Sequence, residues 1–276
     1  MTDFNHAVIE EFRRNHGRVG GPFEGARLIL LTTTGARSGR PHTVPLGYLP
    51  DGGDRLLVIG SAGGSPHHPQ WYRNLLARPR ATIEDGVFRY PAEALSLAGA
   101  ERDAAFARAV EADPGWLTYQ EQSGRTLPVI ALIAAGQGPP EPMTGGSAGA
   151  MLVAAHDAFR RELALIRRDL LTPGSTVGAQ LRIDCLTLCA GLGRHHAGED
   201  QAIFPMLADR HPELGPAIER LTAEHAKVAD LLEQLRQVLG ENAADRDRLT
   251  AVVDRLITEL EDHLRYEEEQ LVTLLG

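Results

Sequence analysis

Two segments of the C-terminal half place an imidazole and a carboxylate four residues apart. They read HHAGE at residues 195–199 and HLRYE at residues 263–267. On a helix, residues four apart lie on one face, so each pair can offer two ligands to a single metal ion. The flanks of the two segments also align without a gap, which places Ile203 opposite Leu271. We interpret them as an internal repeat whose copies face each other across a helical bundle.

Two further histidines stand alone, His156 in AAHDAFRREL and His225 in AEHAKV. Imidazole and carboxylate ligands without thiolate suit non-haem iron better than manganese or zinc. The predicted metal ligands, four imidazoles and two carboxylates, are His156, His195, Glu199, His225, His263 and Glu267.

A second pair, His196 and Asp200, has the same spacing one position further round the helix. We prefer His195 and Glu199, because only that pair aligns with the second motif. The competing interpretation is a bundle with surface histidines and ordinary salt bridges between residues four apart. His211 lies in an HPEL turn and is interpreted as a helix-boundary residue.

Four long helices are needed to bring these residues together. From residue 151 onward apolar residues recur at spacings of three and four, and LLTPGS, HPELGP and GENAAD interrupt them. The predicted helices span about residues 151–170, 177–210, 216–240 and 245–275. Short connections make neighbouring helices antiparallel, so we predict an all-α up-down four-helix bundle.

The two cysteines of the chain, Cys185 and Cys189, share one face of the second predicted helix. We interpret them as small buried residues of the bundle core, with a disulfide or a thiol redox role as the less favoured alternatives.

Residues 151–275 resemble the hemerythrin HHE family through AAHDAFRREL, HHAGEDQAIFPML, AEHAKV and DHLRYEEEQL. The resemblance implies a bridged di-iron site that binds dioxygen or related small ligands. Oxygen carriers of this family supply a fifth histidine one turn before the position of His225, where this chain has Leu221. We therefore expect sensing, peroxide or nitric oxide chemistry rather than simple oxygen carriage.

Two glycine-containing segments of the N-terminal half could bind an anion. TTTGARSGRPHTVPL, residues 32–46, carries two arginines, and SAGGSPHHPQWYRNL, residues 61–75, ends in a predicted helix start. Glycine lets the backbone approach a ligand, and guanidinium groups bind phosphate or carboxylate in pairs of hydrogen bonds. Ordinary hairpin turns are the competing interpretation.

Short apolar runs separated by turns surround these two segments. The predicted strands are residues 27–33, 42–49, 55–61, 80–84, 88–96 and 127–134, and the predicted helices are residues 3–15, 69–77 and 99–112. This order favours a mainly antiparallel sheet that closes toward a small barrel, with helices packed outside. The apolar stripe of the first helix is interpreted as a packing face, with a substrate lid as the alternative.

Residues 5–135 resemble the deazaflavin-dependent nitroreductase and quinone reductase family, through T-T-x-G-x-x-S-G-x-x-x-x-x-P-L and G-G-x-x-x-x-P-x-W-Y-x-N-L. The resemblance implies an α+β split β-barrel, FMN-binding-like in fold, that binds the reduced deazaflavin coenzyme F420. It assigns the phosphate and glutamate tail of F420 to Arg37, Ser38, Gly39 and Arg40. It assigns the deazaflavin ring to Ser61, Ala62, Gly63 and Gly64, with Trp71 and Asn74 supporting that loop.

Tyr119, in WLTYQEQSGRTLPVIAL, is the candidate for contact with the reducible substrate, and a core tyrosine is the alternative. A deazaflavin carries out hydride transfer itself, so no protein nucleophile is required. His67 and His68 are interpreted as solvated residues of the cofactor loop.

Charge divides the chain of 276 residues in the same place as the motifs do. Residues 1–135 carry no net charge, whereas residues 151–276 carry −8 of the total of −9. An acidic bundle disfavours nucleic acid and anionic membrane as partners. Residues 136–150, GQGPPEPMTGGSAGA, are interpreted as a linker between domains at 1–135 and 151–276.

The apolar runs are too short to span a bilayer, and the N-terminus lacks the pattern of a secretory signal, so we expect a cytoplasmic protein. The predicted function is a two-module redox protein. A deazaflavin-dependent oxidoreductase that reduces a quinone-type or nitro-type acceptor is joined to a di-iron domain that binds dioxygen, peroxide or nitric oxide. The alternatives are a regulatory bundle that senses these ligands or iron, and a barrel that binds FMN or haem. Barrels of the implied kind often form homodimers.

Overall fold

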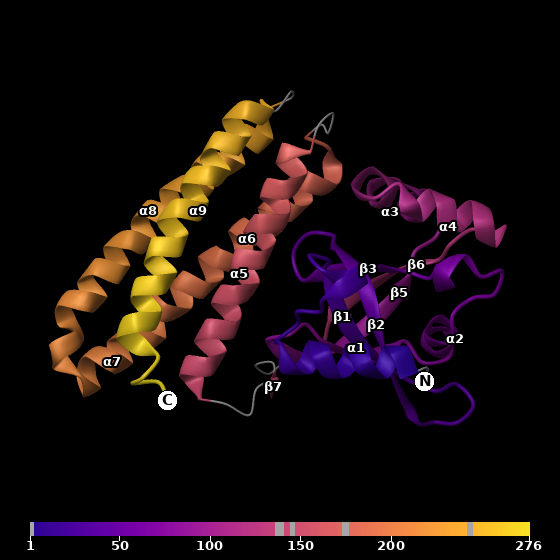
Figure 1. Ribbon diagram of the computed structural model, residues 1–276, viewed down its shortest axis with the longest axis horizontal. Helices are drawn as coiled ribbons and strands as arrows, with labels where there is room; N and C mark the ends of the chain where they lie inside the picture. The colour runs from indigo at the N-terminus through magenta and orange to yellow at the C-terminus, as the bar shows by residue number, and fades with distance from the viewer. Residues whose placement is uncertain (1–2, 136–140, 144–146, 173–176, 242–244) are drawn as a thin grey trace. The chain divides into compact units, whose positions relative to one another are not determined.

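A computed structural model describes residues 3–135, 141–143, 147–172, 177–241 and 245–276. The chain divides into two compact units, residues Met1–Gly145 and Gly146–Gly276 (Figure 1). In the described parts of both units, no helix combines the length and apolarity that crossing a membrane requires.

A closed antiparallel barrel forms the N-terminal unit. Its strands are β1 (Leu28–Thr34), β2 (Pro41–Pro50), β3 (Arg55–Ile59), β4 (Arg80–Glu84), β5 (Phe88–Ser96) and β6 (Val129–Ala134). They pair in the order β4-β1-β2-β3-β6-β5, and pairing of β4 with β5 closes the ring. The short strand β7 (Glu141–Pro142) adds to β5, in the stretch expected to be linker. The predicted small antiparallel barrel is confirmed.

Alternating side chains of the barrel strands enter different hydrophobic cores, as the two-residue period of a strand requires. Ile29 and Leu31 face the barrel interior, whereas Leu28 and Leu30 of the same strand pack under helix α1 (Asp3–Arg14). Val8, Ile9 and Phe12 of α1 are buried in that contact. The apolar stripe of the first helix is therefore a packing face at these positions.

Three further helices complete the N-terminal unit: α2 (Gln70–Ala77), α3 (Gly99–Ala112) and α4 (Gly115–Ser123) (Figure 1). Trp71 and Leu75 of α2 join the interior core of the barrel, and Phe106 of α3 packs on the outer face of β3 and β6. Helix α4 was not predicted from the sequence, because it has little apolar periodicity and follows α3 after only a short Asp-Pro break.

Helices alone form the described part of the C-terminal unit. They are α5 (Ala148–Leu171), α6 (Ala179–Gly198), α7 (Phe204–Arg210), α8 (Gly215–Gly240) and α9 (Arg246–Leu271). A π-helical turn, Glu199–Ile203, joins α6 to α7, so these form the second long element that was predicted as one uninterrupted helix. In Figure 1 the long helices run side by side, and the predicted up-down four-helix bundle is confirmed.

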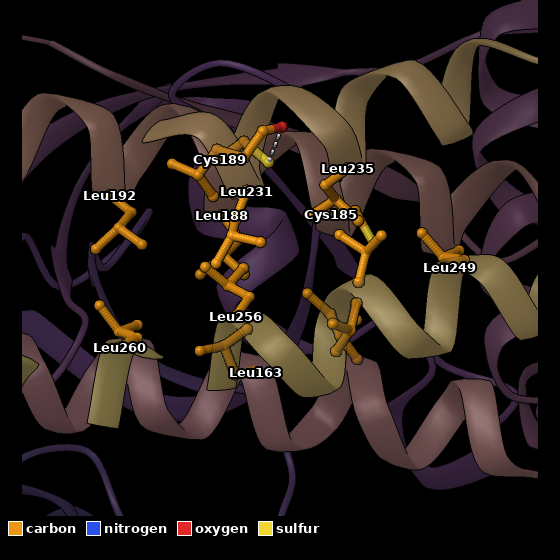
Figure 2. Close-up of a cluster of buried hydrophobic side chains, with 14 of the residues drawn as sticks. Leu163, Cys185, Leu188, Cys189, Leu192, Leu231, Leu235, Leu249, Leu256 and Leu260 are labelled. Atoms are coloured by element: carbon orange, nitrogen blue, oxygen red, sulfur yellow. Dashed lines mark hydrogen bonds between the residues drawn. The ribbon is translucent and has the colours of Figure 1, made fainter. Parts of the chain in front are cut away.

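Leucine side chains fill one half of the bundle, with the two thiols among them (Figure 2). Cys185 and Cys189 are both fully buried, and neither takes part in a disulfide. The Cys189 thiol points toward the Leu232 carbonyl, and burial raises its pKa to about 11, so it stays an unreactive thiol. The interpretation of these cysteines as core residues is confirmed.

Candidate metal centre and cofactor site

Seven buried or nearly buried ligand residues meet in the interior of the bundle. They form two groups, one of His196, His225 and His263, the other of His156, His195, Glu199 and Glu267. Within each group the ligand atoms lie within 4.8 Å of one another, the spacing that a shared metal ion requires. All four long helical elements contribute, and the six residues predicted from the sequence are all present.

The two carboxylates lie between the two groups of histidines. One oxygen of Glu199 is 3.1 Å from His195 Nε2 and the other is 3.7 Å from His225 Nε2. Glu267 Oε2 is 3.4 Å from His156 Nε2 and 3.6 Å from His263 Nε2. Each carboxylate therefore touches a histidine of each group, which is the arrangement of a bridging ligand between two metal ions.

Burial makes these polar atoms costly unless a cation binds them. The Nε2 atoms of all five histidines and both oxygens of each glutamate are buried without a hydrogen-bond partner. Buried polar atoms in native proteins are nearly always satisfied. Burial, together with the Glu267 carboxylate, raises the pKa of Glu199 to about 9, and burial beside His156 lowers the pKa of His195 to about 3. These buried ligand atoms therefore suit a bound metal cation.

Carboxylates behind the cluster orient three of the histidine rings. The Nδ1 atom of His156 lies 2.9 Å from Glu268, that of His225 2.9 Å from Asp200, and that of His263 3.1 Å from Glu224. A carboxylate accepts and does not donate, so Nδ1 carries the proton in each ring. The lone pair of each Nε2 then faces the cluster, as metal-bound histidines require.

His196, which the predicted ligand set does not include, also lies in the cluster. Alignment with the second motif favours His195 over its neighbour, but both imidazoles lie in the interior, each in a different group. The π-helical turn at Glu199–Ile203 begins just beyond these histidines and inserts an extra residue into the turn. The HH doublet before Glu199 was the signal in the sequence for a second imidazole at this turn.

Position 221, where oxygen carriers of the hemerythrin family have a histidine, is an apolar position in this bundle. Leu221 is fully buried in a second apolar cluster of the bundle, so helix α8 contributes only His225, as predicted. His196 on helix α6 nevertheless brings the number of converging imidazoles to five. The absence of a histidine at position 221 therefore does not leave the site one imidazole short.

In the barrel unit, the turn between β1 and β2 carries the predicted tail-binding residues. Arg37, Ser38, Gly39 and Arg40 are all exposed, and Gly39 has a φ of +66°. A Cβ at Gly35 would lie 2.3 Å from the Ser38 hydroxyl and 2.9 Å from His42 Nε2, so a larger residue there would displace these side chains. Two guanidinium groups thus project from a tight turn into solvent.

Helix α2 fixes that turn from behind. The fully buried Asn74 accepts a hydrogen bond from the Ala36 amide at 3.1 Å and donates one to the Thr33 hydroxyl at 3.0 Å. Arg78 donates to the Gly35 carbonyl at 3.1 Å. Asn74 therefore supports the β1–β2 turn, not the loop at residues 61–64 to which the resemblance assigned it. Trp71 lies in the barrel core.

The loop after β3 has an unusual backbone. Ala62, Gly63 and Gly64 have φ angles of +51°, +62° and +81°, so three consecutive residues are left-handed. A Cβ on Gly63 would meet nothing within 4 Å, which leaves open space above that residue for a ligand. Tyr119 of α4 lies beside this loop, 3.6 Å from where a Cβ on Gly64 would stand, and is partly exposed. Tyr119 is thus a surface residue next to the loop, not a core tyrosine.

Comparison with known proteins agrees with both halves of this picture. The family model described as F420H(2)-dependent quinone reductase matches residues 5–134. The F420H(2)-dependent quinone reductase of Mycobacterium tuberculosis strain H37Rv is 34% identical over 125 residues, which cover 44% of this chain and 83% of the relative. The chain belongs to the F420H(2)-dependent quinone reductase family. Its residues 148–275 match the hemerythrin HHE cation binding domain, so it joins a quinone reductase family domain to a hemerythrin domain.

Three further proteins are similar to part of this chain. A putative F420H(2)-dependent quinone reductase of M. tuberculosis is 35% identical over 104 residues, covering 38% of this chain and 87% of that protein. The solved structure of an F420-H2 dependent reductase, FDR-A, is 38% identical, covers 38% of this chain and 93% of its own, and has a TM-score of 0.36. A second structure, described as a domain-swapped dimer, is 35% identical with a TM-score of 0.38; the match covers 46% of this chain and 92% of that one.

Proposed function

We propose that this protein is an F420H2-dependent quinone reductase whose hemerythrin domain holds a dinuclear non-haem iron centre. The observation that carries the metal centre is the set of five unpartnered Nε2 atoms facing two unpartnered carboxylates. The reductase activity is supported by the family of the barrel unit and by the two exposed segments that suit the parts of F420.

For the coenzyme, the chain offers two different surfaces joined by helix α2. The exposed guanidinium groups of Arg37 and Arg40 suit the phosphate and carboxylates of the F420 tail. The left-handed loop Ser61–Gly64 suits the flat deazaflavin ring, because glycines allow close approach of the backbone. When bound, F420H2 supplies the hydride, and the protein's part is to bind and orient it.

The acceptor site is proposed on helix α4. Tyr119 and Leu117 leave 39% and 43% of their surfaces exposed, and Tyr119 lies beside the loop proposed for the ring. An aromatic ring with an exposed hydroxyl can pack on a quinone and donate a hydrogen bond to its oxygen. We propose that Tyr119 orients the acceptor there.

In the bundle, we propose that one iron takes the nitrogens of His196, His225 and His263, and the other those of His156 and His195. Glu199 and Glu267, each beside a histidine of both groups, would supply carboxylate oxygens to both ions. The second group holds one imidazole fewer, so its ion would have room for dioxygen, peroxide or nitric oxide. His195, with 16% of its side chain exposed, is the most exposed of the cluster residues, so a small ligand would reach the cluster beside His195.

The purified full-length chain tests both parts. In an anaerobic mixture of F420H2 and a naphthoquinone, rapid oxidation of the reduced deazaflavin should require the protein. Elemental analysis should give about two iron atoms per chain. Failure of the quinone to oxidise F420H2 would refute the reductase, and a chain that retains no iron after reconstitution would refute the metal centre. Anaerobic F420H2 without quinone shows whether electrons reach ferric iron.

A further inference from the structure

We propose that Arg125 is a positioning residue that holds the loop at residues 60–68 in the shape that receives the deazaflavin ring. The inference rests on the proposed F420 function of the barrel and adds to it a residue outside both segments assigned to the coenzyme. Arg125 follows helix α4 and is only partly exposed.

A single guanidinium group contacts this loop at five places. Arg125 donates to the carbonyls of Gly60 at 2.9 Å, Ser61 at 3.0 Å, Ser65 at 3.2 Å and His67 at 3.3 Å, and to Nδ1 of His68 at 3.0 Å. These partners lie within nine consecutive residues, on both sides of the left-handed turn. A guanidinium carries five N–H donors in one plane, which an ammonium cannot reproduce.

The loop needs such support because its backbone is strained. Ala62 has a φ of +51°, a left-handed conformation that is unfavourable for a residue with a Cβ atom. Two turn hydrogen bonds hold the segment from within, Gly64 to Ser61 and Ser65 to Ala62, both at 3.2 Å. No residue from Ser61 to His68 is buried, so packing of apolar side chains does not fix the turn. Strained backbone persists only where its surroundings determine it.

The chain around Arg125 is itself held in place. Helix α4 ends at Gly124 with a φ of +62°, which turns the chain toward the loop. Two residues after Arg125, the carbonyl of Leu127 accepts hydrogen bonds from the buried Arg102 at 2.7 and 3.0 Å, and the Leu127 amide donates to Gln120. The guanidinium of Arg125 is thus presented from a rigid frame formed by α3, α4 and β6.

A preformed loop binds its ligand more tightly because less conformational entropy is lost on binding. Without Arg125 the loop carbonyls lose their common donor, and Ala62 can relax toward negative φ. The ring-binding surface is then present only part of the time. Lysine keeps the charge but offers three donors, so it should hold the loop only in part.

The experiment uses the full-length chain as wild type, Arg125→Ala, Arg125→Lys and the control Arg14→Ala, which removes an exposed arginine of α1. Hydrogen exchange without coenzyme measures the mobility of residues 60–68. Titration with oxidised F420 measures its affinity. We expect faster exchange in this loop but not in β1 or β6 for Arg125→Ala, and an affinity at least about tenfold weaker. Arg125→Lys should lie between, and Arg14→Ala should match the wild type.

Unchanged loop exchange and unchanged F420 affinity in Arg125→Ala would overturn the proposal. A lower melting temperature with unchanged affinity would also overturn it, since Arg125 would then only stabilise the fold. If Arg125→Ala does not fold, Arg125→Lys decides by the same two measurements. If the wild type does not bind F420, the proposed coenzyme is wrong, and the exchange measurement still tests whether Arg125 holds the loop.

Discussion

The imidazole of His196 stacks on that of His225, with ring centroids 4.0 Å apart and planes 11° apart. The two residues lie on different helices, α6 and α8. His196 also lies 5.2 Å, centroid to centroid, from His263 on α9. Through these contacts one group of the cluster consists of three imidazoles drawn from three helices.

Replacing His196 should therefore remove one metal ion rather than the whole centre. We expect His196→Ala to bind about half as much iron as the wild type, because His156, His195 and both carboxylates remain for the other ion. Elemental analysis after anaerobic reconstitution measures the ratio. His211→Ala, at the end of α7 and outside the cluster, is the matched control and should keep the full complement. Full iron occupancy in His196→Ala would exclude residue 196 as a ligand.

Glu268 should set metal affinity without being a ligand. Its carboxylate holds the Nδ1 proton of His156 and is in turn bound by Arg160 at 2.8 Å. Glu268→Gln weakens this support, and outer contacts of this kind are typically worth about 10–100-fold in metal affinity. Competition with a chelator of known affinity measures the loss. Glu269→Gln, the exposed neighbour, removes the same charge and should change the affinity little.

Removal of metal should destabilise the bundle and leave the barrel unchanged. The cluster buries five imidazoles and two carboxylates, whose free atoms carry a desolvation cost unless a cation binds them. A bound ion at a concentration 1,000 times its Kd stabilises the folded state by about 4 kcal/mol. Calorimetry with and without chelator should show a lower Tm for the helical transition alone. Equal helical Tm values would mean that the cluster folds without a cation.

Gly63 should be required for the coenzyme more than for folding. At φ +62° an alanine is strained by roughly 1–2 kcal/mol, but its Cβ would meet nothing within 4 Å. We expect Gly63→Ala to weaken F420 binding by more than this strain energy accounts for, because the Cβ occupies the space proposed for the ring.

Gly53→Ala supplies the matched control for that experiment. Gly53 lies in the β2–β3 hairpin with a φ of +58° and equally open space at its Cβ position. Both variants should lose similar stability in denaturant unfolding, and only Gly63→Ala should lose F420 affinity. Equal affinities for the two variants would place the ring elsewhere.

The spacing of residues along the sequence was sufficient to predict both folds and most of the metal-cluster residues. The two H-x-x-x-E motifs, the single histidines on two other helices and the apolar spacing predicted the bundle and six of the seven cluster residues, because helical periodicity alone decides which side chains share a face. Alternating apolar residues and turn signals likewise predicted the barrel strands. The short helix α4 was not predicted, because its nine residues have weak apolar periodicity.

Tertiary structure decided what local pattern could not. Alignment of the two motifs favoured His195 over His196, whereas the packing of the helices places His195 beside His156 and stacks His196 on His225. The family resemblance assigned Asn74 to support of the loop at residues 61–64. Its hydrogen-bond partners Ala36 and Thr33 are about 40 residues away in the sequence, and the fold of the barrel brings them together. Arg125 contacts residues 60–68 for the same reason. Hydrogen bonds between distant segments depend on how elements pack, which the periodicity within each element does not contain.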